Sequence, residues 1–120
     1  MKSWVIFKRF KEGLNKNEVV WFLEDYEAVR DGQKGHNQHP EVNSHIDIIQ
    51  KALEEPDIVN FDKDYPKRRC YYSKFKDDGL YPSGYMKVVT QHMWYGKIRV
   101  VTAHFRYSVG KGEKKIYEKR

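Results

Sequence analysis

The chain has few of the features that mark three large classes of protein. Cys70 is the single cysteine among 120 residues, which excludes a disulfide within the chain and a zinc site built from several thiolates. No apolar run approaches the roughly 20 residues that span a bilayer. The apolar patch before Lys8 and Arg9 is too short for the core of a signal peptide. We therefore expect a cytoplasmic protein that has no membrane partner.

The sequence also lacks internal repeats, low-complexity linkers and any break in composition that would mark a domain boundary. Its 120 residues fit one ordinary domain, and we expect residues 1–120 to form it. A chain of this length buries roughly two thirds of the surface that its unfolded form exposes. That burial provides a core without metal ions or disulfides, and the sequence predicts no cofactor.

Positive charge is in excess. Lys and Arg number 23 against 17 Asp and Glu, which gives a net charge of +6 and a pI of about 9.3. Such an excess attracts polyanions and speeds encounter with them. Aromatic residues make up 15% of the chain, and beside cations they can stack on unpaired bases, although aromatic residues also fill cores. The composition therefore predicts a nucleic acid as partner, and RNA before DNA.

Patterns in the first half of the chain predict helices more than strands. Ser3 to Phe10 and Glu18 to Leu23 are expected to be short strands or extended segments. Asp25 through Asp31 is expected to form a short helix that stops at Gly32.

The clearest helix of the sequence follows. Ile46, Ile49 and Leu53 repeat at the three- to four-residue spacing of an apolar helical stripe. Asn43-Ser44 is expected to cap the helix. Pro56 is expected to end it, because the residue before a proline is driven out of helical geometry.

From Asp57 onward the apolar residues recur with a period of two, which is typical of strands. The last two long strands are expected to form a hairpin about Tyr95-Gly96. Helices followed by an antiparallel meander indicate an α+β fold, in which N-terminal helices pack on a roughly four-stranded antiparallel sheet. The predicted strands lie at residues 58–61, 69–75, 85–94, 97–107 and 115–118.

Alternation along the strand at residues 97–107 predicts which side chains share a face. Val101, Ala103 and Phe105 are expected to face the helices. The opposite face is a candidate site, although antiparallel sheets commonly expose polar side chains of this kind to solvent. The residues expected on that face are Ile98, Val100, Thr102, His104 and Arg106.

Three of the five histidines lie close together, at His36, His39 and His45. With Glu41, the first two offer plausible metal ligands. However, Pro40 disrupts any helix through them, and no fixed-spacing signature such as His-Glu-x-x-His occurs, so we predict no metal site. Acid–base chemistry needs no partner ion and suits a group that titrates near neutral pH. The remaining alternative is that these are ordinary loop and capping histidines.

A series of short segments occurs in an order that resembles a known family. The segments are His-Pro-Glu-Val (39–42), an amphipathic helix, Glu-Pro-Asp-Ile (55–58), Arg-Arg-Cys-Tyr-Tyr-Ser-Lys (68–74), Tyr-Met-Lys-Val-Val (85–89) and Val-Val-Thr-Ala-His (100–104). In this order they resemble the phage-associated branch of the barnase–EndoU–colicin–RelE (BECR) nuclease superfamily. The resemblance covers about Val19 to Lys119. It implies a small nuclease domain with helices ahead of a four-stranded antiparallel sheet.

The resemblance also implies roles for individual residues. Its catalytic positions fall on His39, Arg69, Lys87 and Thr102, and its substrate-binding positions include Glu41 and Tyr72. The strands that carry the candidate face add Lys74, His104 and Arg106 as substrate-binding residues. The chain departs from the family in two places. His36 is a poor positional match for the histidine that lies farther ahead of His-Pro-Glu, and His104 stands where an aromatic residue often follows Thr-Ala.

The chemistry that the resemblance implies is metal-independent cleavage of RNA. A ribose 2′-hydroxyl attacks the adjacent phosphate, so a histidine would move protons and cations such as Arg69, Lys87 or Arg106 would neutralise the phosphorane. The hydroxyl of Thr102 would orient a phosphate oxygen. Such a ribonuclease could be a toxin or a phage effector with an antitoxin or immunity protein as partner. Two alternatives remain: a nonenzymatic nucleic-acid-binding module, or a host-protein-binding module, of phage or mobile-element origin. The sequence does not indicate the oligomeric state.

Overall fold

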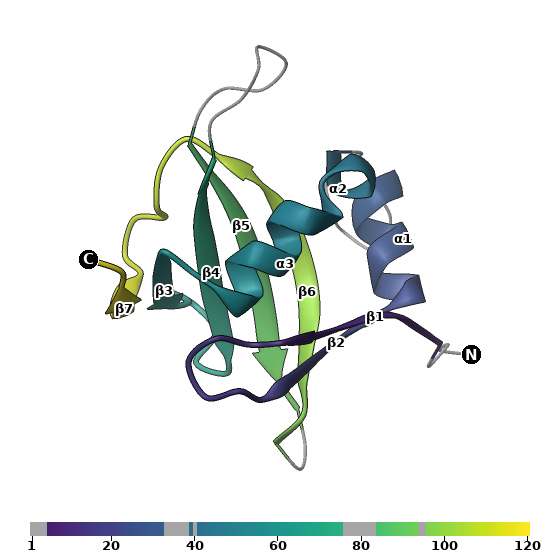
Figure 1. The fold of residues 1–120 in the computed structure, drawn as a ribbon, viewed down its shortest axis with the longest axis horizontal. Helices are drawn as coiled ribbons and strands as arrows, with labels where there is room; N and C mark the ends of the chain where they lie inside the picture. The colour runs from purple at the N-terminus through teal and green to yellow at the C-terminus, as the bar shows by residue number, and fades with distance from the viewer. Residues whose placement is uncertain (1–4, 33–38, 40, 76–83, 94–95) are drawn as a thin grey trace.

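The computed structural model describes residues 5–32, 39, 41–75, 84–93 and 96–120, whose arrangement is shown in Figure 1. Within these residues the chain forms seven strands and three short helices. The strands are β1 (Ile6–Lys11), β2 (Glu18–Phe22), β3 (Ile58–Phe61), β4 (Arg68–Phe75), β5 (Gly84–His92), β6 (Ile98–Arg106) and β7 (Lys114–Glu118). The helices are α1 (Leu23–Asp31), α2 (Glu41–Ser44) and α3 (Ile46–Glu54).

All seven strands join one mixed sheet in the order β1-β2-β6-β5-β4-β3-β7. β2 runs parallel to β6 and pairs with it through Val19 and Ile98 and through Val20 and Arg99. The α+β prediction, with N-terminal helices packed on a roughly four-stranded antiparallel sheet, is therefore wrong. The structure is mostly β, because the two strands of the first half extend the same sheet instead of leaving that half to helices.

Most of the predicted elements are present where the sequence places them. The strand at residues 58–61 agrees with β3 residue for residue, and the other predicted strands and helices end within about three residues of those observed. The predicted strand at 85–94 corresponds to β5 and pairs antiparallel with β6, as the predicted hairpin requires. Residues 1–4, 76–83, Trp94 and Tyr95 lie outside the described residues, so the turns predicted there are not tested.

The predicted cap of α3 is wrong. His45 occupies the N-cap position and makes no side-chain capping hydrogen bond. Asn43 instead accepts a hydrogen bond at Oδ1 from the Tyr26 hydroxyl, at 2.7 Å. This bond joins α2 to α1, so the side chain that the sequence suggests for capping one helix holds two others together.

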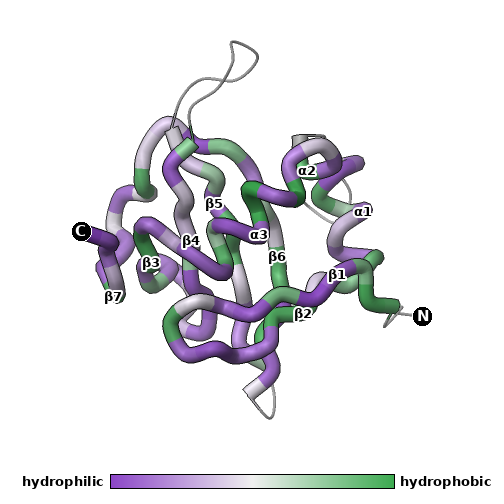
Figure 2. The backbone as a smooth tube through the Cα atoms, in the orientation of Figure 1, coloured by the Kyte–Doolittle hydropathy of each residue, from purple (hydrophilic) through white to green (hydrophobic). Residues whose placement is uncertain are grey.

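The helices cover one face of the sheet. In Figure 1, α3 lies across β4, β5 and β6, and its residues Ile49, Ala52 and Leu53 are fully buried. Their spacing places them on one side of the helix, which is the side that faces the sheet. Trp21 of β2 is also fully buried and meets the Tyr26 ring edge to face at 5.3 Å. Figure 2 shows green hydrophobic stretches that alternate with hydrophilic ones along β5, β6 and α3, as expected for elements with one buried face. No helix in the described ranges is long and apolar enough to cross a membrane.

The opposite face of the sheet carries a smaller buried cluster. A segment between β6 and β7, residues 107–113, covers part of this face, and we call this segment the strap. Val109 of the strap packs on the cluster, and the backbone N–H of Gly110 donates a hydrogen bond to the Tyr72 hydroxyl at 3.2 Å. The cluster consists of Ile58, Cys70, Tyr72, Val89 and Val101, with Tyr85 beside it.

A bulge in β6 decides which of its side chains face the helices. Val89 pairs with Thr102, but the next residue, Thr90, pairs with Val100, so Val101 is extra. Alternation therefore restarts after Val101.

Ala103 and Phe105 face the helices, as predicted. Thr102, His104 and Arg106 alternate with them and so share the opposite face, also as predicted. Three of the predicted placements are wrong because of the bulge. Ile98 and Val100 belong to the helix-side core, and Val101 belongs to the cluster under the strap.

Candidate functional site

His104 and His39 meet beside β6, beyond the part of that strand that pairs with β2. Within the described residues β2 pairs with β6 only near the start of β6, and α1 and α2 also contact β6. The backbone N–H of His39 donates to the carbonyl of Val29 in α1, at 2.9 Å, which fixes the position of the residue. The two imidazole rings are stacked, with centroids 4.9 Å apart and planes 20° from parallel. The structure thus brings together one predicted catalytic residue and one predicted substrate-binding residue.

The surroundings of His104 hold it in the neutral form. Burial lowers the pKa of His104 to about 3, and the neighbouring His39, Lys87 and Arg106 act in the same direction. Its Nδ1 is buried and has no hydrogen-bond partner within the part of the chain that the structure describes. A neutral imidazole can accept a proton, and an anion bound beside Lys87 and Arg106 would raise the pKa of His104 toward its usual range.

Lys87 lies beside His104 in the sheet but is already paired. The two residues are register partners on β5 and β6. Lys87 Nζ lies 2.9 Å from Oε2 of Glu113 at the end of the strap, and the side chain of Glu113 is only 3% exposed. A buried ion pair of this kind neutralises the lysine, so its charge is not available to a second anion while Glu113 remains in place.

Two further side chains donate hydrogen bonds to the same carboxylate. The Tyr72 hydroxyl lies 2.7 Å from Oε1 and 2.9 Å from Oε2 of Glu113, and Asn60 Nδ2 lies 3.2 Å from Oε1. Burial raises the pKa of Tyr72, which keeps its hydroxyl protonated as a donor. We call Asn60, Tyr72, Lys87 and Glu113 the Glu113 cluster.

A cleft of about 370 Å³ opens beside the Glu113 cluster. Its walls come from the turn after β3, from β5 and β6, and from the strap. Cations outnumber anions among its lining residues, which suits a ligand with negative charge. The charged residues of the lining are Lys63, Lys87, Arg106, Lys111, Asp62, Asp64 and Glu113.

The structure does not bring Arg69 to the other predicted residues. Arg69 alternates with Tyr72 and Cys70 so that it faces the helix side of the sheet, where it lines a cavity with Tyr71. Its guanidinium carbon lies 4.4 Å from the centroid of the Phe61 ring, and Nη1 donates to the backbone carbonyl of Pro66 at 2.9 Å. The guanidinium is thus engaged locally on the face opposite to Lys87.

The remaining predicted residues occupy varied positions. Thr102 is half-buried on the same face as His104. Lys74 is exposed on the Tyr72 side of β4, and its backbone N–H donates to Asp57 Oδ2 at 2.6 Å. Glu41 is the first residue of α2, and its side chain lies outside the described part of the structure.

Glu113 and Asn60 are the residues of this face that the sequence analysis missed. One signal could have drawn attention to Glu113, because it is the only acidic residue between Asp78 and Glu118. A lone carboxylate in a basic stretch has many possible partners, and only the fold shows that it reaches Lys87. Nothing in the sequence singles out Asn60.

Neither a metal ion nor a reactive thiol is indicated among the described residues. No group of three or more His, Cys, Asp and Glu there is arranged to hold a metal. The site considered from His36, His39 and Glu41 is not tested, since His36 and the Glu41 side chain lie outside the described part. Burial raises the pKa of the Cys70 thiol to about 12, which keeps it protonated and unreactive.

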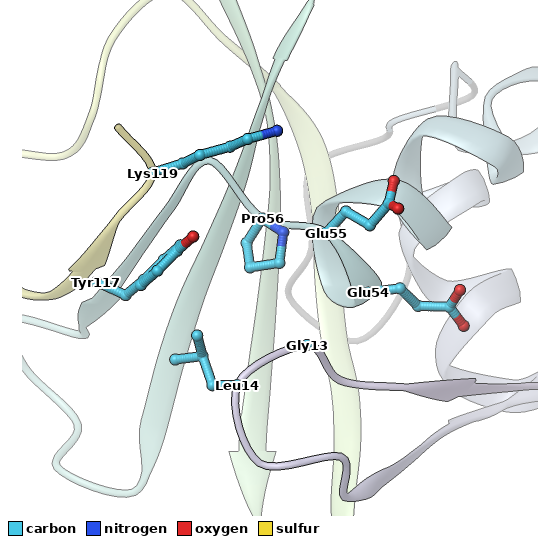
Figure 3. A pocket seen from close by; sticks show the side chains of 7 residues that line it. All are labelled: Gly13, Leu14, Glu54, Glu55, Pro56, Tyr117 and Lys119. Atoms are coloured by element: carbon cyan, nitrogen blue, oxygen red, sulfur yellow. The ribbon is translucent and has the colours of Figure 1, made fainter.

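Another cavity, of about 340 Å³, lies between the β1–β2 turn, the end of α3 and β7, and no histidine lines it. Figure 3 shows Leu14, Pro56 and Tyr117 around it, while the carboxylates of Glu54 and Glu55 point away from these three. None of the predicted site residues lines this cavity. It lacks the histidines and the clustered cations of the opposite face, so the candidate site remains at His104.

Comparisons of the chain with protein-family models, with curated proteins and with solved structures found no match.

Proposed function

We propose that the protein is a metal-independent endoribonuclease whose chemistry centres on His104 and His39. The observation that carries the proposal is the stacked His39–His104 pair, in which a neutral imidazole lies among cations. The face around it presents Arg106 and, when unpaired, Lys87 to a phosphate. The order of segments that resembles the BECR nuclease superfamily suggests the same function, although the four-stranded antiparallel sheet that this resemblance implies is not the sheet observed.

The proposed reaction needs one proton acceptor and one proton donor. His104 accepts the proton of a ribose 2′-hydroxyl as its oxygen attacks the adjacent phosphorus. The bond from phosphorus to the 5′-oxygen then breaks, and His39 gives that oxygen a proton. The products are a 2′,3′-cyclic phosphate and a 5′-hydroxyl. Arg106 neutralises charge on the phosphorane, which is the type of stabilisation that lowers such barriers most, and Thr102 orients a phosphate oxygen through its hydroxyl.

A phosphate bound at this site would also change the pKa of His104, the proposed general base. A pKa of about 3 makes His104 a weak proton acceptor in the free protein, whereas general bases work best with a pKa near the working pH. The negative charge of the bound phosphate favours the imidazolium and raises this pKa. The base would thus become effective when substrate is present.

We also propose a compartment, the cytoplasm, and a protein partner for this ribonuclease. RNA is present in the reducing cytoplasm, where the free thiol of Cys70 would also persist. A cytoplasmic ribonuclease of the toxin or phage-effector kind needs restraint, so an antitoxin or immunity protein is the partner that we propose for it.

The test is an RNA-cleavage assay in chelator, with the product ends identified by mass spectrometry. Wild-type protein is expected to leave 2′,3′-cyclic phosphate ends, and His104→Ala is expected to lower the rate by roughly 10²- to 10⁴-fold, as for the loss of one acid–base group. His92→Ala is the matched control, because His92 is a second half-buried histidine that lines a cavity on the helix side. Thr102→Ala tests the phosphate contact.

The role of His39 has its own test. In RNA whose 5′-oxygen at the cleaved bond is replaced by sulfur, the leaving group needs no proton. His39→Ala is expected to cut this substrate almost as fast as the wild type does. If it remains as slow as on ordinary RNA, His39 is not the proton donor.

A second candidate function is favoured by the Lys87–Glu113 ion pair. That pair neutralises a predicted catalytic cation, as a nonenzymatic nucleic-acid-binding module would allow. Binding of RNA with steep salt dependence but without cleavage would establish this second function. If the wild type neither cuts nor binds RNA, both fail and a host-protein-binding module is the alternative left.

A further inference from the structure

We propose that Glu113 is an intramolecular stand-in for a substrate phosphate, and that RNA displaces it by lifting the strap. The strap would therefore regulate the face on which the proposed function rests. The Glu113 cluster is an anion site built from one ammonium, one hydroxyl and one amide group, all donating to the carboxylate oxygens. Phosphate oxygens accept hydrogen bonds from these same groups.

The fit of the carboxylate in its site is tight. Gly110 of the strap has no side chain, and a Cβ atom built there would collide with Oε2 of Glu113. The backbone N–H of Gly110 donates a hydrogen bond to the Tyr72 hydroxyl, and that hydroxyl donates one to Glu113. Tyr72 therefore contacts the strap at two points. These contacts close the site around one negatively charged group.

The rest of the strap is weakly held. Tyr107, Ser108, Lys111 and Gly112 are all exposed, and Val109 is half-buried against the cluster under the strap. Gly112 has a φ of 84°, a left-handed conformation that favours glycine. Backbone segments with few buried contacts open at low free-energy cost compared with global unfolding.

Cations at the rim of the cleft would receive the rest of the ligand. Lys63, Lys111 and Arg106 line the same cleft as Lys87, so a polyanion with several phosphates contacts more than one of them at once. A single carboxylate cannot do this. RNA therefore has a basis for competing with Glu113, which brings only one negative charge to the site.

The experiment measures binding of a 2′-O-methyl RNA oligonucleotide, which cannot be cleaved by 2′-hydroxyl attack. Glu113→Gln keeps the shape of the side chain and removes its charge. We expect the Kd to fall by roughly tenfold, the effect of freeing one charged hydrogen-bonding group. The salt dependence should steepen by about 0.7 in the log–log slope, which corresponds to one additional phosphate contact with a single strand.

Asp64→Asn is the matched control. Asp64 is an exposed carboxylate in the wall of the same cleft, so this variant changes the net charge equally without touching Lys87. Its Kd is expected to fall by about twofold at most, as for an exposed charge. In the double variant Lys87→Gln/Glu113→Gln, the gain should disappear.

Movement of the strap is measured in the wild type, so no variant needs to fold for this test. Amide hydrogen exchange across residues 109–113 is expected to become faster when the oligonucleotide binds. Circular dichroism checks that each variant is folded. If Glu113→Gln is not folded, Glu113→Asp withdraws the carboxylate by one methylene, and its Kd should fall in the same direction by a smaller factor.

Three results would overturn the inference. The first is an equal change in Kd for Glu113→Gln and Asp64→Asn, and the second is slower exchange of the strap in the complex. The third is loss of cleavage in Glu113→Gln with an unchanged Kd, which would make Glu113 part of the chemistry. The proposed ribonuclease activity is judged separately by the His104→Ala assay. If RNA binds more tightly to Glu113→Gln but neither the wild type nor any variant cuts it, displacement of Glu113 by RNA is supported and the ribonuclease activity is rejected.

Discussion

The two faces of the sheet are both covered, but they are covered by different kinds of contact. On the helix side, α1, α2 and α3 bury a large group of apolar side chains, Trp21 and Leu53 among them. On the other side, the strap covers a few apolar residues and places a carboxylate over Lys87. Apolar packing is nondirectional and scales with buried area, whereas a buried ion pair depends on geometry and on both partners being present.

The two faces therefore have different roles, one in stability and the other in the placement of charged groups. The helix-side core supplies most of the stability, because it buries many more apolar residues. The strap side contributes little apolar burial but fixes the position of charged groups around His104. If this division is correct, substitutions on the first face should change stability alone, and those on the second should change stability together with pH or anion dependence.

The largest effect is expected for Trp21→Ala on the helix side. Trp21 is fully buried, and truncation of a core tryptophan lowers the free energy of unfolding by about 3–5 kcal/mol. Urea unfolding followed by circular dichroism measures this loss. The folded fraction should bind oligonucleotide as the wild type does, and a loss of binding without a loss of stability would contradict the division between the faces.

Glu113→Ala on the strap side should cost about 3 kcal/mol, because it leaves the buried ammonium of Lys87 without a counter-charge. Replacing both members of the pair by apolar residues, as in Lys87→Met/Glu113→Leu, should recover most of the loss. Urea unfolding of Lys87→Met, of Glu113→Leu and of the double variant gives the coupling between the two side chains. Additive losses would show that the ion pair does not carry the stability of this face.

A smaller effect is expected from pH through His104. The pKa of an unfolded histidine is about 6.5, and burial lowers the folded pKa of His104 to about 3. The unfolded chain therefore binds more protons in this window, and stability falls as the pH drops from 6.5 toward 3. The loss is about 1.6 kcal/mol between pH 6.5 and 5, since the slope rises from half of its maximum of about 1.4 kcal/mol per pH unit.

His104→Gln isolates this contribution from that of the acidic residues. Its free energy of unfolding should fall less steeply than that of the wild type over the same pH range. Parallel curves for the two proteins would mean that His104 titrates normally in the folded state. Saturating oligonucleotide should raise the pKa of His104 in the wild type, which NMR titration of the imidazole protons can follow.

The smallest effect is expected for an exposed ion pair. Arg9 and Glu18 join β1 to β2 with both side chains 58% exposed, and Arg9→Gln should lower the free energy of unfolding by less than about 1 kcal/mol. Added salt should reduce even this difference. A loss as large as that of Glu113→Ala would remove the distinction between buried and exposed pairs on which the comparison depends.

Local patterns were sufficient to predict most of the helices and strands. The three- to four-residue spacing of Ile46, Ile49 and Leu53 predicted α3, and alternation predicted β3 through β7 within a few residues. These signals come from short stretches of sequence, where one buried face imposes its own period. The same locality explains the error in fold class, because the parallel contact of β2 with β6 joins distant segments that share no local signal.

The candidate site could be predicted in part for the same reason. Alternation correctly placed Thr102, His104 and Arg106 on one face, since all three follow the bulge at Val101. It failed before the bulge, because one extra residue reverses the alternation and leaves no mark in the composition. Arg69 shows a similar limit: its strand was predicted, but which of its sides faces the helices depends on register.

The charges on the two outer strands of the sheet affect whether copies of the molecule can pair edge to edge. β1 and β7 are the two edges of the sheet, and unpaired edge strands invite pairing with strands of other molecules. β1 carries Lys8, Arg9 and Lys11, and β7 carries Lys114 and Lys115. Two copies that joined edge to edge would bring these like charges together, so the basic edges act against fibre growth and favour a sheet that ends at its seventh strand.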